Sequence, residues 1–391
     1  MTKRIGITWQ LSDVSGWGNF GLNLVYELAR KKNLQPLLLL PPDFRNIDPL
    51  SERLLDPLIK EQQELAVLSA SNPGKVATLG DAVILHHLTS SLELSDVSAS
   101  FRGKRNIGVV FFESSAFGQG PLERARKFDQ VLAGSSWNGE VLKQNGLRNI
   151  QVLLQGVDLA RFHPLPDARQ LMPDRFIIFS GGKLEYRKGQ DIVVAAFRIF
   201  YRRHPDALLV TMWHSPWPGV SDTLQSSPHV SNAPELDEHG KQKMIEWASV
   251  NGIPERGFID LGLIPNPHLP NILRNVDVAV FPNRCEGGTN LVAMECMAMG
   301  IPCILSGNTG HLDLIESKGC FPLRNQTPVA SSDGSTDDWG ESSVDELVEK
   351  MEQLYDRIGD GKKRGKIAAS WIQNFSWCNQ VDKLCRLVNS G

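Results

Sequence analysis

The chain lacks any long hydrophobic run, any large excess of one charge and any cysteine pattern typical of disulfides or zinc sites. Its apolar runs are short, for example 37–40, 192–197 and 278–281. A membrane-spanning helix needs roughly 18 to 20 apolar residues in succession, so we expect no transmembrane segment. The first apolar run begins at Ile5, with no signal-peptide core before it. A cytoplasmic protein is the expectation that follows.

The charge balance also excludes a class of partner. Lys and Arg together number 41 and Asp and Glu number 44, for a formal net charge of −3. A protein that binds nucleic acid regardless of sequence needs a strongly basic surface, so we expect no nucleic-acid partner. The six cysteines form no CxxC pair, and several lie in apolar segments, which predicts reduced and mostly buried thiols and no metal site. They are Cys285, Cys296, Cys303, Cys320, Cys378 and Cys385.

What the chain does contain is enough apolar material for two domains. It has 391 residues, of which 41% are hydrophobic, and domains average about 150 residues. Short apolar runs alternate with helix-like segments, a pattern typical of parallel α/β sheets buried on both faces. We predict two doubly wound Rossmann-like domains facing a cleft. The apolar runs are 5–9, 37–40, 82–85, 107–112, 131–133, 152–154, 176–179, 207–213, 258–261, 278–281 and 301–305.

The boundary between the two domains is expected in the proline-punctuated stretch 156–174. We place the N-terminal domain at 1–165 and the C-terminal domain at 166–370. The stretch 325–343 is rich in Ser, Asp, Gly and Thr and predicts a long surface loop, followed by a helix around 344–358.

The segment from Gly16 to Gly21 matches the GxGxxG pattern of dinucleotide-binding turns, between a strand and a helix predicted from Leu22 to Lys31. In a Rossmann turn the first glycine follows the strand almost directly, whereas here residues 10–15 intervene. We therefore expect the amides of Gly16 and Gly18 to contact a ligand in a glycine-rich loop, and we do not expect a nicotinamide cofactor. Tight NAD binding would support the dehydrogenase alternative.

A second candidate site begins where the run 176–179 ends. Gly182 and Lys183 follow it, Lys188 lies five residues further on, and a helix is predicted from about Gln190. Ligands of open α/β domains bind beyond the carboxyl ends of the strands, and two fixed cations there suit a diphosphate. A solvated loop explains the spacing equally well.

The third candidate site is the stretch 281–302. A glycine-rich turn contains Glu286, Thr289 or Asn290 can cap the following helix, and Glu295 lies inside that helix among apolar residues. The free amides of a helix N-terminus suit a phosphate. A buried Glu295 needs a partner, either a hydroxyl-rich ligand or a neighbouring arginine or amide. Because Glu295 lies roughly 7 Å along the helix axis, we expect the two glutamates to contact different parts of one long ligand.

His86 and His87 follow the run 82–85 in the first domain. A lone histidine is more often structural, but the end of a strand is where a ligand site would lie. The pair is retained as a catalytic candidate, with no choice between the two.

Several of these segments resemble the retaining glycosyltransferases of family 4, which have the two-domain GT-B fold. The resemblance covers most of the chain and is strongest from 151 to 315. The chain departs from the family's E-x7-E motif in one respect, because eight residues rather than seven separate Glu286 from Glu295. Gly287 would fit the usual spacing. The similar segments are 131–142 with Ser135-Ser136-Trp137, 155–164 ("NGVD…F.P", with Gln155 for Asn), 182–189 ("GRL…KG", with Lys183 for Arg), 286–295 (E-x7-E), 310–313 ("GG..E") and 375–377 ("fsW").

The resemblance implies a role for each candidate residue. Gly182, Lys183 and Lys188 would hold the diphosphate of a nucleotide-sugar. Amides near Thr289, Asn290 and Leu291 would add to that site, Glu295 would bind the ribose, and Glu286 would touch the donor sugar. Gly16 and Gly18 would close over the phosphates from the opposite domain, and His86 or His87 would lie near the reacting sugar. The catalytic set is thus Glu286, His86, His87, Lys183 and Lys188.

The resemblance also implies an acceptor-binding N-terminal domain, a donor-binding C-terminal domain and a helix, 371–391, that crosses back to the first domain. We expect no cofactor and no metal, because the lysines would replace a divalent ion. The acceptor would be sugar-containing or lipid-linked, which leaves peripheral membrane contact open. Retention at the anomeric carbon rests on the resemblance. A nucleotide-sugar epimerase of the same fold and a non-catalytic nucleotide-sugar-binding protein are the alternatives.

Overall fold

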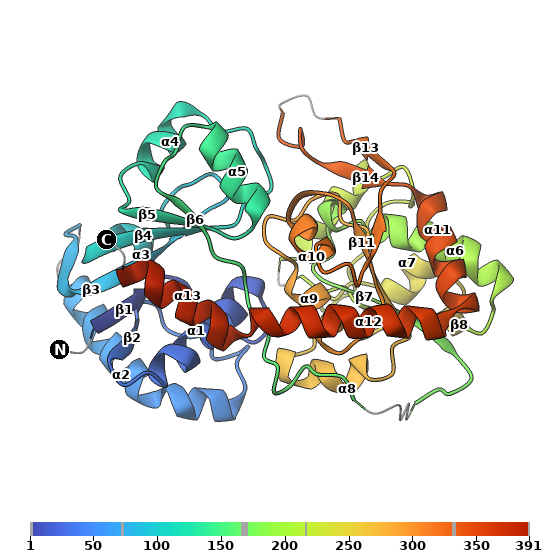
Figure 1. The fold of residues 1–391 in the computed structure, drawn as a ribbon, viewed down its shortest axis with the longest axis horizontal. Coiled ribbons are helices and arrows are strands. Elements are labelled where there is room, and N and C mark those ends of the chain that lie inside the picture. The colour runs from blue at the N-terminus through green and yellow to red at the C-terminus, as the bar shows by residue number, and fades with distance from the viewer. Residues whose placement is uncertain (1–2, 72–73, 166–170, 216, 331–333, 390–391) are drawn as a thin grey trace. The chain divides into compact units, whose positions relative to one another are not determined.

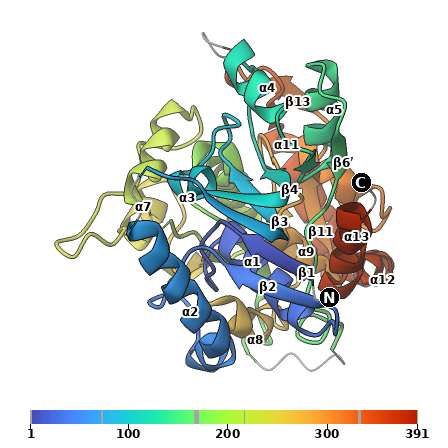
Figure 2. The ribbon, with the colours of Figure 1, turned by 90° about the vertical axis from the view of Figure 1, so that its left-hand side faces the viewer.

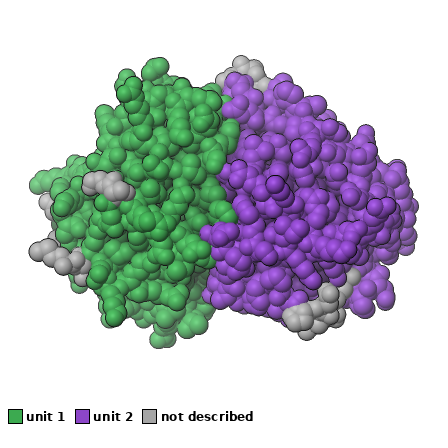
Figure 3. Space-filling view, in the orientation of Figure 1, with its two compact units in different colours: residues 1–156, 265–267, 375–391 green, residues 157–264, 268–374 purple. Residues whose placement is uncertain are grey.

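The computed structural model describes residues 3–71, 74–165, 171–215, 217–330 and 334–389. The chain forms two compact units, coloured separately in Figure 3. Unit 1 contains residues 1–156, 265–267 and 375–391, and unit 2 contains 157–264 and 268–374. The chain thus leaves unit 1 at Gly156, at the start of the stretch 156–174 in which the sequence predicts the boundary, and residues from Phe375 onward pack with unit 1.

Unit 1 is built on a six-stranded sheet of the described residues, in the order β2-β1-β3-β4-β5-β6, and every neighbouring pair is parallel. Figure 2 shows β2, β1, β3 and β4 one beside the next. The chain extends the sheet first on one side of β1 and then on the other, so the order reverses between β1 and β3. The strands are β1 (Lys3–Ile7), β2 (Leu34–Leu38), β3 (Ala77–Leu88), β4 (Phe101–Val110), β5 (Gln130–Ala133) and β6 (Ile150–Val152).

Unit 2 repeats this arrangement, with the described strands in the order β12-β11-β10-β7-β8-β9, again parallel throughout. Here the order reverses between β7 and β10, next to the first strand of the unit. Open parallel sheets bind ligands at such a reversal, beyond the carboxyl ends of the strands. The strands are β7 (Phe176–Gly181), β8 (Ala207–Met212), β9 (Phe258–Asp260), β10 (Val278–Phe281), β11 (Cys303–Ser306) and β12 (Phe321–Leu323).

Helices cover these sheets (Figure 1). Those of unit 1 are α1 (Gly16–Ala29), α2 (Pro49–Ala70), α3 (Asp96–Ser100), α4 (Gln119–Ala125), α5 (Ser136–Gln144) and α13 (Trp377–Asn389). Those of unit 2 are α6 (Gln190–Arg203), α7 (Met244–Val250), α8 (Leu269–Leu273), α9 (Leu291–Ala298), α10 (Leu312–Ile315), α11 (Val344–Asp356) and α12 (Ile358–Ile372), with short 3-10 turns η1 (Tyr186–Lys188), η2 (Pro218–Ser226) and η5 (Thr309–His311). Throughout the described residues, none of the helices combines the length and apolar character needed to cross a bilayer.

Local sequence explains why several helices begin where they do. The hydroxyls of Ser15, Ser135 and Ser343 precede α1, α5 and α11, and each accepts a hydrogen bond from an amide in the first turn of its helix. Such side-chain caps satisfy backbone donors that the helix itself leaves without a partner.

The core of unit 2 lies around its central strands. All six residues of β7 are buried, which explains its unbroken apolar run. Ile178 on this strand belongs to one cluster with Phe197 and Phe200 of α6 and Trp213 beyond β8. Because these side chains fix the strands, the loops that follow the strands start from rigid positions.

The sequence correctly predicts two parallel α/β sheets, and each of the eleven apolar runs overlaps a strand. The stretch 325–343, expected as a surface loop, instead contains an antiparallel pair, β13 (Gln326–Pro328) and β14 (Gly340–Ser342). The cysteines are free thiols, and four of them are buried, as the sequence predicts. Within the described ranges, no group of three or more His, Cys, Asp or Glu side chains could hold a metal ion.

Gly189 shows where the fold depends on glycine. It joins η1 to α6 with a φ of +69°, and a Cβ atom there would lie 2.2 Å from the carbonyl oxygen of Pro282. We predict that Gly189→Ala lowers the free energy of unfolding by at least about 1–2 kcal/mol, because both the backbone and the neighbour resist a side chain.

The control for this variant is Gly359→Ala in α12. No atom lies within 4 Å of a Cβ atom added at Gly359, and alanine favours a helix by up to about 1 kcal/mol over glycine. Urea unfolding midpoints should therefore fall for the first variant and hold or rise for the second. Equal midpoints would contradict this account of Gly189.

Candidate functional site

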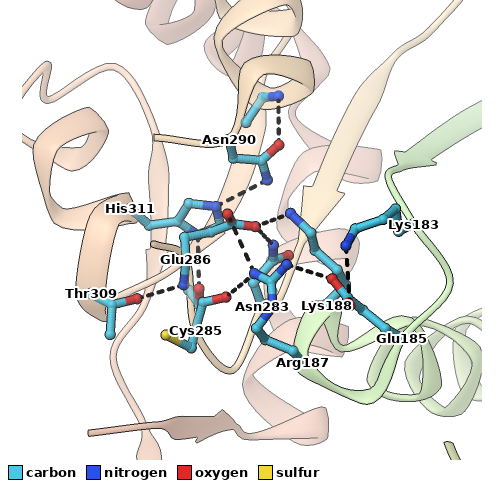
Figure 4. A network of polar contacts seen from close by, with 12 residues as sticks. Lys183, Glu185, Arg187, Lys188, Asn283, Cys285, Glu286, Asn290, Thr309 and His311 are labelled. Carbon is cyan, nitrogen blue, oxygen red and sulfur yellow. Dashed lines mark hydrogen bonds and ion pairs between the residues drawn. The ribbon is translucent and has the colours of Figure 1, made fainter. Parts of the chain in front are cut away.

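Charged side chains gather in unit 2 at the carboxyl ends of β7, β10 and β11, where the strand order reverses (Figure 4). Three loops supply them: 182–189 after β7, 282–290 after β10 and 307–311 after β11. Residues from these separate parts of the sequence meet because parallel strands end on the same edge of the sheet.

Lys188 and Glu286 form the central ion pair of this site. Their side chains are only 13% and 6% exposed. The Glu286 carboxylate also accepts a hydrogen bond from the amide of Asn283, and it lies 3.6 Å from the guanidinium of Arg187. The backbone N–H of Glu286 donates to the hydroxyl of Thr309 at 2.8 Å. Glu286 is thus fixed by contacts from all three loops.

The two charges of this pair control each other's protonation. Burial alone would raise the pKa of Glu286, but Lys188 and Arg187 lower that pKa to about 2. Burial lowers the pKa of Lys188, and the charge of Glu286 opposes that change. The lowered pKa favours the ionised form of Glu286, which accepts hydrogen bonds at neutral pH.

Lys183 is the more exposed of the two predicted lysines. Its side chain is 40% exposed, and its Nζ lies 3.5 Å from a carboxylate oxygen of Glu185 and 5.7 Å from the ring centroid of Trp217. Glu185 forms a second ion pair with Arg187. Lys183, Arg187 and Lys188 thus belong to one cluster with Glu185 and Glu286, in which the cations outnumber the carboxylates.

The predicted donor-binding residues after Glu286 surround the start of α9. Asn290 caps this helix in a left-handed conformation, with φ at 64°, and its side chain accepts a hydrogen bond from the amide of Ala293. The Thr289 hydroxyl is buried against the sulfur of Met294, at 2.9 Å. Leu291 is the first residue of α9, and Glu295 lies one turn further along, only 4% exposed.

Two of the predicted donor-binding residues, Gly182 and Glu286, can now be compared with their observed contacts. Gly182 has a φ of +125°, and its amide donates to the carbonyl of Met212 at 3.1 Å, so that amide is already used within the sheet. Glu286 forms an ion pair with Lys188. Gly287, which fits the usual seven-residue spacing of the E-x7-E motif, has no side chain that could form this pair.

His86 and His87 lie in different surroundings in unit 1. His86 is fully buried, and its ring nitrogens contact the Ser98 carbonyl at 3.1 Å and the Asn106 side chain at 2.9 Å. His87 is only partly buried, and its ring packs edge-on against Trp17 with centroids 4.4 Å apart. Burial lowers the pKa of both imidazoles. His87 is therefore the histidine whose ring is not held by core polar contacts.

The glycine-rich loop expected at Gly16 to Gly21 is wrong, because α1 already begins at Gly16. The Ser15 hydroxyl accepts a hydrogen bond from Gly18 N–H at 3.0 Å, so that amide is occupied. A Cβ atom at Gly18 would lie 2.0 Å from the hydroxyl of Ser12. Gly18 therefore serves close packing against residues 12–15, whereas a Cβ atom at Gly16 would meet no atom within 4 Å.

Partly buried aromatic rings gather at the carboxyl ends of the strands in unit 1. Trp17 packs edge-on against both His87, near the end of β3, and Phe111, directly after β4, with the second pair of centroids 4.8 Å apart. All three side chains keep partial exposure. Such a group offers flat apolar surfaces to a ligand.

Sequence reasoning missed the residues that hold the predicted ones in place. Glu185 and Asn283 have no motif of their own, and each contacts a charged residue of its own loop: Glu185 pairs with Arg187, and Asn283 donates a hydrogen bond to Glu286. His311 is part of a segment that resembles the family motif, but the sequence does not show that its ring contacts Asn290 at 3.1 Å and Ser306 at 2.8 Å.

Comparison with known proteins connects this geometry to a family. Residues 165–322 match the model described as glycosyl transferases group 1. Residues 267–384 match the model described as family 4 glycosyltransferase in conflict systems. The two matched regions together span the lysine loop, the Glu286 loop and α9.

Three curated relatives show similar levels of identity. The D-inositol 3-phosphate glycosyltransferase of Paenarthrobacter aurescens is 27% identical over 59% of this chain and 49% of its own length. A GDP-mannose-dependent alpha-(1-6)-phosphatidylinositol monomannoside mannosyltransferase of Mycolicibacterium smegmatis is 26% identical over 69% of this chain and 78% of its own. The mannosylfructose-phosphate synthase of Agrobacterium fabrum is 27% identical over 47% and 39%. The match thus spans about half the length of the first of these relatives.

Solved structures share the fold over the whole chain. The sucrose-phosphate synthase of Thermosynechococcus elongatus has a TM-score of 0.65 at 16% identity, covering 99% of this chain and 98% of that one. Anabaena HepE in complex with UDP-glucose has a TM-score of 0.66 at 15% identity, covering 100% of each.

Two parallel sheets of this topology, with these neighbours, define the GT-B fold class. In the matched regions, which hold the lysine loop and the Glu286 loop, the chain is similar to the group 1 glycosyl transferases and to family 4 glycosyltransferases.

His311 gives this site a testable dependence on pH. Burial lowers the pKa of His311 from 6.5 to about 4, so the unfolded chain binds a proton more readily than the folded chain between these values. The contribution of His311 to the free energy of unfolding is therefore fully present above pH 6.5. It falls by roughly 3 kcal/mol as the pH drops toward 4.

We predict that His311→Gln reduces the fall in urea unfolding midpoint between pH 7 and pH 5. Some dependence should remain, because burial also lowers the pKa of His86, His87 and His214. His239→Gln is the control, since His239 is 81% exposed and should leave the wild-type dependence unchanged. An unaltered pH dependence in the His311 variant would refute this assignment.

Proposed function

We propose that this chain transfers a sugar from a nucleotide-sugar donor to a hydroxyl group of an acceptor, and that unit 2 holds the donor. The observation that carries the proposal is the cluster of Lys183, Arg187 and Lys188 beside the start of α9, where the strand order reverses. Fixed cations and a helix N-terminus at this position suit a diphosphate.

The similar proteins support this class of donor. One relative is named as GDP-mannose-dependent, and HepE shares the fold in a complex with UDP-glucose. Glu295 is proposed to accept hydrogen bonds from the ribose hydroxyls, and Glu286 from the donor sugar.

The proposed chemistry is stabilisation of the leaving group. When the bond between sugar and diphosphate breaks, negative charge grows on the departing phosphate oxygen. Cations that are already in position contribute most at that moment, because they need no rearrangement. Lys183 and Lys188 would supply this charge without a divalent ion. Retention at the anomeric carbon is part of the proposal on the strength of the family resemblance alone.

We propose that the acceptor binds to unit 1. Trp17, His87 and Phe111 would face its ring, and His87 is the histidine proposed to lie near the reacting sugar. The relatives' names describe phosphorylated or lipid-linked hydroxyl compounds, including inositol phosphate and a phosphatidylinositol mannoside. An acceptor of the second kind would bring the protein, which we propose to be cytoplasmic, to the inner face of a membrane.

Lysine variants test the donor site directly. We predict that Lys183→Ala weakens binding of a nucleoside diphosphate by about tenfold or more, the value of a charge-assisted hydrogen bond, without lowering the melting temperature, because Lys183 is 40% exposed. Lys188→Ala should weaken binding and also destabilise the fold, because it leaves the buried Glu286 carboxylate without its main cation.

Lys363→Ala serves as the control, since its side chain is 80% exposed on α12 and pairs with Asp360. Calorimetric titration with UDP and with GDP measures binding, and differential scanning fluorimetry measures stability. Wild-type affinity in the Lys183 variant would contradict the proposed site. Product analysis separates the alternatives: an epimerised sugar nucleotide indicates an epimerase, and donor binding without turnover on any acceptor indicates a binding protein.

A further inference from the structure

Arg284 lies in the Glu286 loop, two residues before Glu286, but has no role in the proposed chemistry. Its side chain is fully buried, between the lysine loop and the core of unit 2. It forms two parallel hydrogen bonds with Asp191 of α6, at 2.8 and 2.7 Å, and Asp191 is also fully buried. Burying an ion pair has a large desolvation cost, which hydrophobic residues of similar volume would avoid. A purely structural need therefore explains this choice of residues poorly.

Every nitrogen of the guanidinium has an oxygen partner. Besides the bonds to Asp191, one Nη1 donor reaches the carbonyl of Tyr186 at 2.6 Å. The Nε and Nη2 groups contact one oxygen of Glu341 on β14, at 3.0 and 2.9 Å. The guanidinium also stacks on the ring of Tyr186, with Cζ 3.7 Å from the centroid. A lysine has only three donors and no planar face, so it cannot reproduce this set.

These contacts act on the residues immediately before Lys188. Arg284 binds two successive carbonyls: its side chain holds that of Tyr186, and its backbone N–H donates to that of Arg187 at 2.7 Å. Arg187 in turn donates from its side chain to the carbonyl of Cys285 at 2.8 Å. The lysine loop and the Glu286 loop are thus joined next to the Lys188–Glu286 ion pair.

The same guanidinium ties in two segments that are distant in the sequence. Glu341 accepts a hydrogen bond from His229, at 2.9 Å, in addition to those from Arg284. Asp191 accepts a hydrogen bond from the hydroxyl of Ser227 at 2.5 Å. Residues 227–229 and strand β14 are therefore connected to the lysine loop through Asp191, Glu341 and Arg284.

We propose that Arg284 is a positioning residue for the donor diphosphate, acting with Asp191 and Glu341. It sets the backbone of η1 so that Lys188 stands against Glu286. A shift of about 1 Å in a group that contacts a substrate can cost up to a hundredfold. The inference rests on the proposed function for its binding measurement, but the position of Lys188 is measured independently of it.

The test compares two arginine-to-lysine variants in the full chain. Arg284→Lys acts at the carboxyl end of β7. Arg175→Lys is the matched control, because Arg175 precedes the other end of the same strand and also holds backbone carbonyls, those of Asp206, Ala207 and Arg256 at 2.7 to 2.8 Å. A structural role alone would lower the melting temperature of both variants and change nucleotide affinity in neither.

We expect Arg284→Lys to raise the dissociation constant for UDP or GDP, whichever binds the wild type, by about tenfold or more. The dissociation constant of Arg175→Lys should stay within about twofold of the wild-type value, a smaller change than the loss of one hydrogen bond to a ligand would cause. A crystal structure of Arg284→Lys should show Lys188 separated from Glu286. If Arg284→Lys does not fold, Glu341→Gln replaces it, since that side chain is 21% exposed; it should weaken binding in the same direction.

Unchanged affinity in Arg284→Lys, or in Glu341→Gln if that variant replaces it, would overturn the proposal, as would an equal loss in the Arg175 control. If the wild type binds neither nucleotide, the proposed function is wrong. The crystal structure then decides the positioning role by itself: an intact pair between Lys188 and Glu286 in the variant tested overturns it, and a broken pair supports it.

Discussion

The ion pair between Lys188 and Glu286 joins the two loops that follow the central strands of unit 2. Each partner alone would be a charge removed from water, and an unpaired buried charge is strongly destabilising. The two buried charges can stabilise each other only because both loops are held close together. Gly189 and the contacts of Arg187 and Arg284 hold the loops in place. Other features of the site depend on this closeness.

The charge of the cluster explains how such a site can be stable before a ligand arrives. Glu185 and Glu286 offset part of the charge of Lys183, Arg187 and Lys188, so the cations do not simply repel one another. The remaining positive charge is accessible at Lys183, which is the more exposed lysine. A diphosphate would meet a preorganised field and would not have to assemble one.

Much of the fold follows from local sequence, because parallel strands buried on both faces produce unbroken apolar runs such as that of β7. Strands β13 and β14 escaped prediction because short polar segments pair only through contacts distant in sequence. The helix α1 begins earlier than predicted because the Ser15 cap outweighs the low helix preference of Gly16 and Gly18.

The candidate site divides in the same way. Lys183, Lys188 and Glu286 could be found from motifs at strand ends. The choice between His86 and His87 could not be made from the sequence, since the two are neighbours near the end of β3 and differ in which one packs inside. Arg284 contacts Asp191 and Glu341, which are distant from it in the sequence. No local sequence pattern predicts these contacts.

A crystal structure of the protein with a nucleoside diphosphate tests the central claim most directly. The account predicts phosphate oxygens within hydrogen-bonding distance, about 2.7–3.0 Å, of the Lys183 ammonium, at the carboxyl ends of β7 and β10. A nucleotide bound at any other place, with both lysines free of phosphate contacts, would contradict it.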